Sequence, residues 1–252
     1  MESNPLAVVR NNTLGTYRLA QAAARNRIRH VLMVSTDKAV RPTSIMGVSK
    51  RMAEQALLEC ATPSTRVNCI RLGNVLDSQG SVVGVFLDQI ARSENITVTD
   101  PDADRYFFTM AETVSLILEA ARAPKHAQIW VPETGSPTKI VDLAKFLIQQ
   151  KSKFPEEPRV VFTGLRPGEK LHEEFVGPGE RLADEVSPRL RAVDGAIAPR
   201  EFVHSAMADL DVAVRARNLD AVLQVIARFV PEYRPGVFLD AKRAAPLVTH
   251  DT

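Results

Sequence analysis

The sequence predicts an α/β protein in which a parallel sheet carries helices on its faces and a mostly helical region follows. Short apolar runs alternate along the chain with longer segments of helical apolar period. Alternation of this kind is typical of repeated strand–helix units, which build parallel sheets. Beyond about residue 177 the alternation gives way to Pro- and Gly-containing sequence, and helical periods then resume.

The first elements lie before residue 61. Residues 5–26 carry apolar side chains at helical spacing, interrupted by Gly15, and this predicts a helix packed on the sheet. Residues 28–35, "IRHVLMVS", contain a continuous apolar run, as expected of a strand buried on both faces. Residues from about 45 to 60 predict the next helix.

The same reasoning assigns the rest of the chain. Further strands are predicted at 66–73, 96–99, 127–133 and 158–164. Helices are predicted at 81–93, 110–123, 139–150, 204–216 and 219–230. We therefore divide the chain into residues 1–176, the sheet-forming part, and residues 177–252, a helical appendage.

Composition excludes several classes of function. The chain has 32 basic and 30 acidic side chains, a net charge of +2 and no dense basic run, so a nucleic-acid partner is not expected. No apolar run approaches the roughly 20 residues of a membrane span, and the first residues lack the apolar core of a signal peptide. A cytoplasmic protein is expected. Cys60 and Cys69 are not spaced as a metal or redox motif, so no metal site is expected. Both are expected to be buried, inert thiols.

Residues 34–50, "VSTDKAVRPTSIMGVSK", gather polar groups where the first strand ends. Ligands of open α/β sheets bind at the carboxyl edge of the strands, where Thr36, Asp37 and Lys38 are expected to lie. Met46 and Lys50 are four residues apart, so they share one face of the next helix. Lys50 can therefore reach whatever sits above Met46.

This segment resembles the active site of short-chain dehydrogenase/reductase enzymes, in which a Ser or Thr ends a strand and Tyr-x-x-x-Lys follows on the next helix. It is most similar to the CapD-like nucleotide-sugar 4,6-dehydratases of polysaccharide biosynthesis, which include a subgroup with Met at the tyrosine position. Three further stretches support the resemblance, which covers roughly residues 3–176. These are "NPLAVVRNNTLGT", "RLGNVLDSQGSV" and "FTGLRPGEKLHEE".

The resemblance implies a partial Rossmann-like fold, NAD (or NADP) as cofactor, and conversion of a UDP-N-acetylhexosamine such as UDP-N-acetylglucosamine into a 4-keto-6-deoxy sugar nucleotide. It implies that Asp37 protonates the departing C6 hydroxyl and that Lys38 takes the C5 proton. Thr36 is expected to bind the C4 hydroxyl and Lys50 the nicotinamide ribose, so both also contact the cofactor. Met46 is only a weak acceptor and cannot transfer a proton, which moves the C4 proton transfer to Thr36 and Asp37.

Four further residues are expected to bind the substrate. Pro167 and Gly168 favour a type II turn, which would aim Arg166 and Glu169, and an arginine suits a diphosphate. By the same resemblance Asn74 contacts the substrate. Arg105 is a phosphate contact or a structural arginine, with neither favoured. Asp77 stands where glycine is more usual in the family and would restrict the backbone near the sugar nucleotide.

The twelve glycines form no Gly-x-Gly-x-x-Gly motif. A dinucleotide-binding fold normally holds the pyrophosphate with such a turn, so the resemblance implies that the chain begins partway through the family's catalytic domain. NAD binding by this chain alone is then expected to be weak. The exposed sheet edge is expected to be covered by self-association, as a homo-oligomer, or by a separately encoded N-terminal half. A non-catalytic remnant that binds a sugar nucleotide or a partner, and a nucleotide-sugar epimerase, remain alternatives.

Overall fold

A five-stranded sheet forms the centre of the computed structural model, which describes residues 2–76, 78, 80–123, 125–151, 158–183, 187, 189–195 and 197–234. The strand order is β1-β2-β7-β11-β10. Strands β1 (His30–Thr36), β2 (Arg66–Leu72) and β7 (Gln128–Pro132) run parallel, with His30 paired to Arg66 and Thr36 to Leu72. Strands β11 (Leu190–Asp194) and β10 (Arg181–Leu182) complete the sheet in antiparallel pairing. The predicted α/β class is confirmed.

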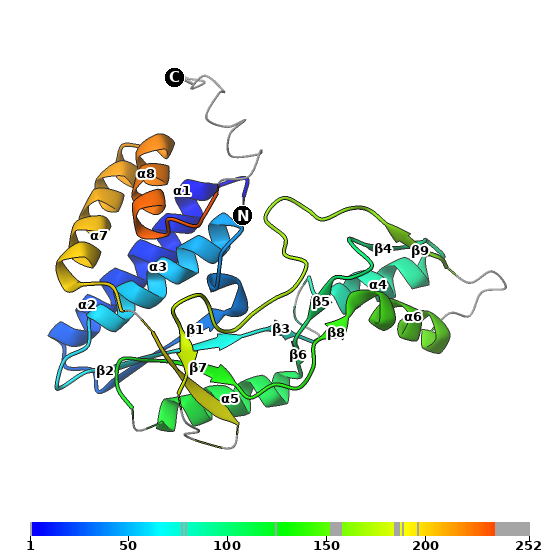
Figure 1. The fold of residues 1–252 in the computed structure, drawn as a ribbon, viewed down its shortest axis with the longest axis horizontal. Helices are drawn as coiled ribbons and strands as arrows, with labels where there is room; N and C mark the ends of the chain where they lie inside the picture. The colour runs from blue at the N-terminus through cyan, green and yellow to red at the C-terminus, as the bar shows by residue number, and fades with distance from the viewer. Residues whose placement is uncertain are drawn as a thin grey trace.

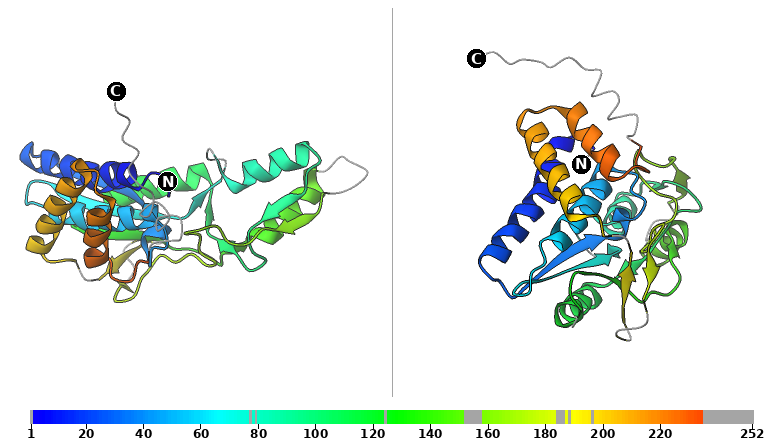
Figure 2. Two further views of the ribbon diagram at one scale, coloured as in Figure 1. Left: turned by 90° about the horizontal axis from the view of Figure 1, so that it is seen from above. Right: turned by 60° about the vertical axis from the view of Figure 1, so that its left-hand side comes forward.

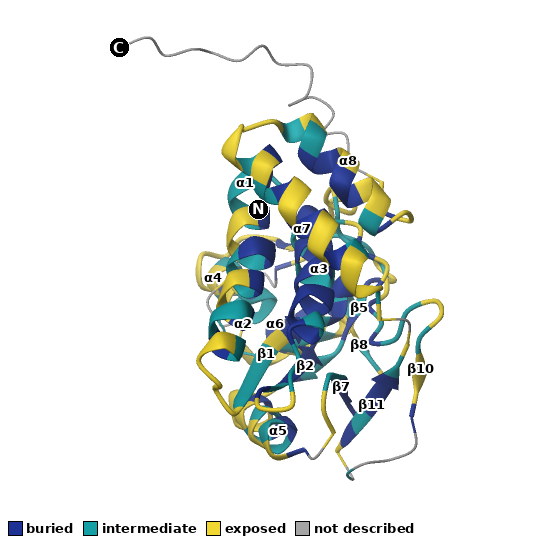
Figure 3. Ribbon diagram, turned by 90° about the vertical axis from the view of Figure 1, so that its left-hand side faces the viewer, coloured by how far each residue is buried: buried dark blue, intermediate teal, exposed yellow. Residues whose placement is uncertain are grey.

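Helices cover both faces of this sheet (Figures 1 and 2). Helix α5 (Met110–Arg122) lies on one face, and α3 (Ile45–Glu59) packs on the other against β1 and β2. Helices α7 (Arg200–Arg215) and α8 (Leu219–Phe229) form a second layer beyond α3. Figure 3 shows the result, since α3 is almost wholly buried while α7 and α8 present exposed residues outward.

The predicted helix at 5–26 forms with an irregularity just before Gly15. It consists of α1 (Pro5–Val8), a π-helical segment η1 (Val9–Leu14) and α2 (Gly15–Arg25). The side chains of Asn12 and Thr13 in η1 donate hydrogen bonds to Ser49 of α3, at 3.0 Å to Oγ and 2.9 Å to the carbonyl. Wide π turns are rare within helices, and this one is tied to the helix that carries Met46 and Lys50.

Residues 82–162 include a smaller lobe, seen at the right of Figure 1. Helices α4 (Val82–Ala91) and α6 (Ile140–Lys151) pack with β4 (Ile96–Val98) and β9 (Val160–Phe162) around a separate apolar core. The strands expected at 96–99 and 158–164 therefore exist, but they pair with each other rather than with the main sheet. Each strand is only three residues long; Ile96 and Val98 of β4 are buried in the core of the lobe, whereas Val161 and Phe162 of β9 are exposed.

Two short ladders connect the lobe to the main sheet. Strand β3 (Asn74–Val75) pairs with β6 (Phe107–Phe108), and β5 (Asp104–Arg105) pairs with β8 (Thr138–Lys139). A 3-10 turn, η2 (Asp37–Ala39), follows β1 directly.

The region after residue 177 contains more than helices. Helices α7 and α8 occupy the stretches expected at 204–216 and 219–230, and α7 begins four residues earlier. Strands β10 and β11 were not predicted, yet both belong to the main sheet. Residues 235–252 lie outside the described part, so the division at residue 176 stays a prediction.

A buried ion cluster fastens the sheet to α3. Arg71 of β2 is fully buried and donates to both oxygens of Glu54 in α3, at 3.0 and 2.8 Å, and to both oxygens of Glu180, at 2.7 and 2.9 Å. Ser35 Oγ donates to Glu54 Oε1 at 2.6 Å. Because a buried arginine needs partners for its whole fork, these two carboxylates hold β2, α3 and the segment before β10 together.

Both cysteines are buried. Burial raises the pKa of Cys60 to about 11 and that of Cys69 well above its ordinary value, so neither thiol forms a thiolate readily. Within the described ranges, no helix is long and apolar enough to cross a bilayer.

Candidate active site

The end of β1 turns sharply through η2 and buries a carboxylate there. Asp37 is completely buried, and its Oδ1 accepts a hydrogen bond of 2.9 Å from Thr36 Oγ1. Thr36 Oγ1 also accepts from the Lys38 backbone N–H, at 3.4 Å, and so caps the turn. The second oxygen of Asp37, Oδ2, is buried with no hydrogen-bond partner among the described residues. Asp37 therefore uses one carboxylate oxygen within the turn, while its other oxygen has hydrogen-bonding capacity that no described residue uses.

Lys38 lies at the centre of this arrangement. Its Nζ donates to Asp37 Oδ1 at 3.0 Å and to Asn74 Oδ1 at 3.1 Å. Glu173 Oε1 lies 3.4 Å from the same nitrogen. The Lys38 side chain is 29% exposed, whereas both carboxylates are almost fully enclosed. The ammonium therefore faces an opening while three acceptors fix it from behind.

Glu173 and Lys170 were not singled out from the sequence. Burial raises the pKa of Glu173, and Asp37 adds to the rise, while the charges of Lys38, Lys170 and Arg105 oppose it. Burial lowers the pKa of Lys170 against the attraction of Glu173, 3.6 Å away. Both residues lie in "GEKLHEE", but only the folded chain separates the inward Glu173 from its neighbour Glu174, which pairs with Arg41 at the surface.

A cavity of about 240 Å³ adjoins Lys38 through its partner Asn74. Lys38 itself does not line this cavity, but all four residues expected to bind substrate do. Asn74 and Arg105 contribute from β3 and β5, and Arg166 and Glu169 from the loop after β9. Its apolar and hydroxyl-bearing wall comes from the small lobe and includes Val82, Val85, Phe86, Thr97, Val98, Thr99 and Ile140. Asn74 is shared between this cavity and Lys38.

The turn predicted at residues 166–169 is confirmed. Gly168 has φ +80°, the left-handed conformation that a type II turn requires at this position, and the Glu169 N–H donates to the Arg166 carbonyl at 2.9 Å. Gly168 also packs closely, since a Cβ added to it would lie 2.9 Å from Ser44 Cβ. Glu169 accepts from Thr99 Oγ1 at 2.9 Å and from Arg105, so its carboxylate braces the loop.

The two arginines that line the cavity differ in how far their guanidinium N–H groups are already hydrogen-bonded. Arg105 is buried, and its four terminal N–H groups meet the carbonyls of residues 104, 170 and 171 and the Glu169 carboxylate. Of the two roles left open for Arg105, this geometry favours the structural one. Arg166 is exposed, and its guanidinium has no hydrogen-bond or ion-pair partner among the described residues. Arg166 is the arginine with donors to offer a diphosphate.

Met46 and Lys50 lie on α3, one turn apart and partly buried. Lys50 Nζ donates to the Val34 carbonyl of β1 at 3.1 Å. Neither residue forms a hydrogen bond or ion pair with Lys38 among the described residues, and neither lines the cavity. Asp77 lies outside the described residues.

The fit to a dinucleotide is partial. Thr36 ends β1, and Lys50 donates to Val34 in the same strand, so both lie near the carboxyl end of β1, where they could hold the nicotinamide end. The sequence contains no glycine-rich turn of the kind that holds a pyrophosphate. The residues present therefore fit one end of the cofactor.

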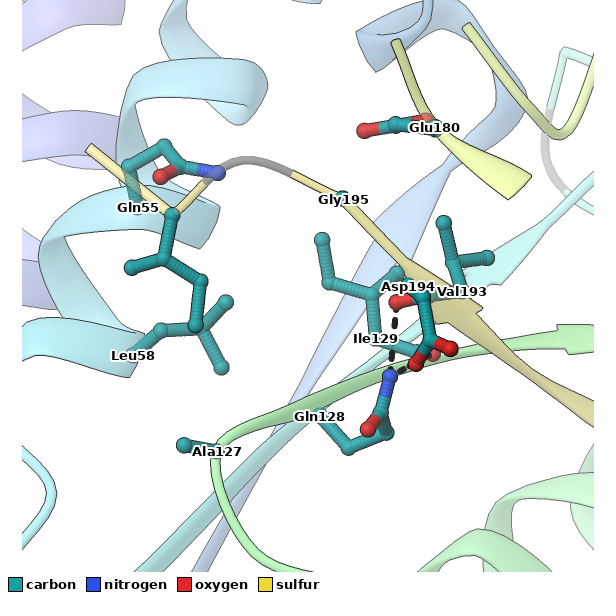
Figure 4. Close-up of a pocket in the computed structure, with 10 residues that line it drawn as sticks. Gln55, Leu58, Ala127, Gln128, Ile129, Glu180, Val193, Asp194 and Gly195 are labelled. Atoms are coloured by element: carbon teal, nitrogen blue, oxygen red, sulfur yellow. Dashed lines mark hydrogen bonds between the residues drawn. The ribbon is translucent and has the colours of Figure 1, made fainter. Parts of the chain in front are cut away.

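A second cavity, of about 160 Å³, lies between α3 and strands β7 and β11 (Figure 4). Its polar groups are already engaged. Gln128 Nε2 donates to the Val193 carbonyl at 2.7 Å, and Gln55 Oε1 accepts from the Ala198 N–H at 2.8 Å. None of the predicted site residues lines it. The cavity beside Lys38 is the stronger candidate.

Comparison with known proteins places the chain in a family. Residues 1–194 match the family described as polysaccharide biosynthesis protein. The chain belongs to this family. The match extends beyond residue 176 and takes in β10 and β11.

Curated relatives agree with this membership. The probable polysaccharide biosynthesis protein EpsC of Bacillus subtilis (strain 168) is 41% identical over 199 residues, and the capsular polysaccharide biosynthesis protein CapD of Staphylococcus aureus is 41% identical over 192. These alignments cover 77% and 75% of this chain but 33% and 32% of the relatives, so the chain spans about a third of their length. A UDP-glucose 4-epimerase of Rickettsia canadensis (strain McKiel) is 34% identical over 179 residues, 69% of this chain and 51% of that protein.

Among solved structures, Pen from Bacillus thuringiensis is similar with a TM-score of 0.70 and 27% identity. The likeness covers 79% of this chain and 63% of that one. It supports the Rossmann-like character of the fold and its partial extent.

Proposed function

We propose that this chain carries the acid–base and substrate-binding part of an NAD-dependent 4,6-dehydratase acting on a UDP-N-acetylhexosamine. One observation carries the proposal, namely that Lys38, held by Asp37 and Glu173, donates to Asn74, and Asn74 lines a cavity together with Arg166. Membership in the polysaccharide biosynthesis family supports a sugar nucleotide as substrate. The 34% identical UDP-glucose 4-epimerase supports a UDP-hexose.

The reaction needs a path for the C4 hydroxyl proton. Thr36 Oγ1 binds that hydroxyl and passes its proton to Asp37, whose Oδ1 is 2.9 Å away. Asp37 then gives the proton to the C6 hydroxyl, which leaves as water. The same carboxylate thus accepts one proton and releases it, and Met46 takes no part because a thioether cannot transfer protons.

Lys38 acts as the base, and then as the acid, at C5 of the sugar. A ketone at C4 makes the C5 proton acidic. Once the ammonium between Asp37 and Glu173 has released a proton to solvent, the neutral Lys38 amine removes the C5 proton as the C6–oxygen bond breaks. The resulting Lys38 ammonium returns a proton to C5 at the end, so the enzyme finishes as it began. When bound, NAD supplies the hydride acceptor for C4 and the hydride donor for C6.

The rest of the site orients the substrate. The free guanidinium of Arg166 would bind the diphosphate with two parallel hydrogen bonds. The Asn74 amide, whose oxygen accepts from Lys38, has N–H groups to offer a sugar hydroxyl beside that lysine. Glu169 and Arg105 keep the loop of Arg166 in place.

Epimerisation at C4 is a second candidate, because a curated relative bears that name. It needs proton transfer at C4 alone and leaves C5 and C6 intact, so it gives no role to a lysine fixed as a base for C5. A chain that only binds a sugar nucleotide would also use the cavity, but would turn nothing over.

The products separate these candidates. The chain is incubated with NAD and UDP-N-acetylglucosamine, alone and together with the part of the B. subtilis relative that it does not match, and followed by NMR. A new C6 methyl signal and loss of the C4 proton signal are expected. An inverted C4 centre would instead establish the epimerase. Unchanged substrate in both mixtures would favour a chain that only binds a sugar nucleotide.

A further inference from the structure

Glu173 is a buried carboxylate that faces three cations. Its side chain is 2% exposed, and its oxygens lie 3.4 Å from Lys38 Nζ, 3.6 Å from Lys170 Nζ and 3.8 Å from Arg105 Nε. Glu173 Oε2 has no hydrogen bond among the described residues, so these charges are what stabilise it. An isolated buried carboxylate would be costly, and each cation offsets part of that cost.

The three cations belong to different parts of the site. Lys38 follows β1 of the main sheet, Arg105 belongs to β5 at the cavity, and Lys170 lies in the loop that carries Arg166. Lys170 also donates to the Val40 carbonyl just beyond η2. One carboxylate therefore connects the turn of Lys38 with the wall of the cavity. Without the negative charge of Glu173, these three cations would repel one another with less compensation.

We propose that Glu173 is a positioning residue for Lys38, holding its amine against Asn74, which lines the cavity, through the shared contact with Arg105 and Lys170. The assignment of chemistry to Lys38 rests on the proposed function, but the positioning itself does not. The adjacent Glu174 supplies a contrast, because it pairs with the half-exposed Arg41 and forms no ion pair within 4 Å with any of the three cations among the described residues; its charge acts on Lys170, but as a smaller influence than that of Glu173.

Lysine acylation tests the positioning without any turnover. The purified chain is treated with an N-hydroxysuccinimide ester, and the rate at each lysine is followed by mass spectrometry in the parent, Glu173→Gln and Glu174→Gln chains. We expect Lys38 and Lys170 to react on the order of tenfold faster in Glu173→Gln, the ratio that loss of one ionic contact gives. Lys50 and Lys139, which have other partners, are expected to keep their rates.

The controls separate positioning from loss of structure. Glu174→Gln is expected to leave all four lysines within twofold of the parent, and Glu173→Asp, which keeps the charge, to restore part of the protection of Lys38. An unchanged rate at Lys38 in Glu173→Gln would overturn the proposal. So would an equal rise at all four lysines, because that pattern reports general loosening.

Kinetics then connect the position to the reaction. In any mixture that turns over, Glu173→Gln is expected to lower kcat at least tenfold with little change in KM, because substrate contacts remain while the base is misplaced. A rise in KM at unchanged kcat would contradict positioning of Lys38. If acylation follows the expected pattern and no chain gives product, the proposed function fails while the placement of Lys38 by Glu173 stands.

Discussion

The Lys38 ammonium meets acceptors from three separate stretches of the chain. Asp37 precedes Lys38 in the turn after β1, and Asn74 follows β2. Glu173, about 135 residues after Lys38, comes from the loop after β9. The sequence brings Asp37 and Lys38 together because they are adjacent, and the motif resemblance adds Asn74. Glu173 could not be predicted, because two successive glutamates in "LHEE" look alike until folding turns one inward.

Two substitutions at the site are expected to differ sharply in their effect on kcat. Lys38→Met removes the base for C5 and is expected to lower kcat about 10² to 10⁴-fold, the usual contribution of a positioned base. Met46→Leu keeps an apolar side chain of similar size at a position with no proton to transfer, so kcat is expected to stay within about threefold. Both are measured by NMR under the conditions that give product. A Lys38→Met chain that kept full turnover would remove the base assignment.

At the scale of elements, the loop of Arg166 depends on a glycine that must also fit tightly. Gly168→Ala combines a left-handed φ with a Cβ at 2.9 Å from Ser44 Cβ, and about 2 to 3 kcal/mol of destabilisation is expected. Gly164→Ala is the matched control, because Gly164 has φ +82° and no atom within 4 Å of an added Cβ. That control is expected to cost about 1 kcal/mol. Urea denaturation measures both, and equal losses would show that the contact with Ser44 does not matter.

The ion cluster of Arg71 makes stability depend on acid. Burial opposes ionisation of Glu180, but the hydrogen bonds and charges of Arg71, with Arg51, lower its pKa to about 2 from an ordinary 4.5. A carboxyl with a lowered pKa in the folded state contributes stability above its unfolded pKa and loses it as the pH falls through the folded value. Unfolding free energy is therefore expected to drop by about 3 kcal/mol between pH 4.5 and pH 2 on account of Glu180.

Urea melts across that range measure the loss. In Glu180→Gln the dependence is expected to be flatter and the stability at pH 7 lower, because Arg71 keeps only one carboxylate. A parent chain and a Glu180→Gln chain with the same slope would contradict the role of Glu180.

The elements predicted from apolar period are those with enough residues to show a period. The helices at 45–60, 110–123 and 139–150 and the strands of the parallel core follow from such patterns. Strands β10 and β11 do not follow from such patterns. The stretch "GPGERLADEV" around β10 has turn residues and charges, and β10 is placed by pairing with β11, which is placed in turn by pairing with β7. The separate pairing of β4 with β9 likewise depends on the core of the small lobe, which local sequence does not report.

At the scale of the whole molecule, β1 forms an edge of the sheet. Its order in the sheet gives it one neighbour, β2, within the described residues, and Val34 on it is 44% exposed. Free strand edges with apolar side chains favour association. We expect the apparent mass in sedimentation to rise with concentration, and Val34→Lys to reduce that rise because charge on an edge strand disfavours pairing. A chain that stays monomeric at all concentrations would contradict this.

Cofactor binding is the other property of the whole chain. Thr36 and Lys50 fit one end of NAD, but the sequence offers no glycine-rich turn for the pyrophosphate, so weak binding to the 252-residue chain is predicted. Calorimetric titration with NAD measures this directly. Tight, stoichiometric binding would show that other residues hold the pyrophosphate.

The most direct test of the account is the fate of the C5 proton. The active mixture is run in deuterium oxide with UDP-N-acetylglucosamine, and the product is examined by NMR. If Lys38 removes and returns the C5 proton during dehydration, the 4-keto-6-deoxy product is expected to carry solvent deuterium at C5. A turned-over product with its original C5 proton would contradict the central claim and point to chemistry at C4 alone.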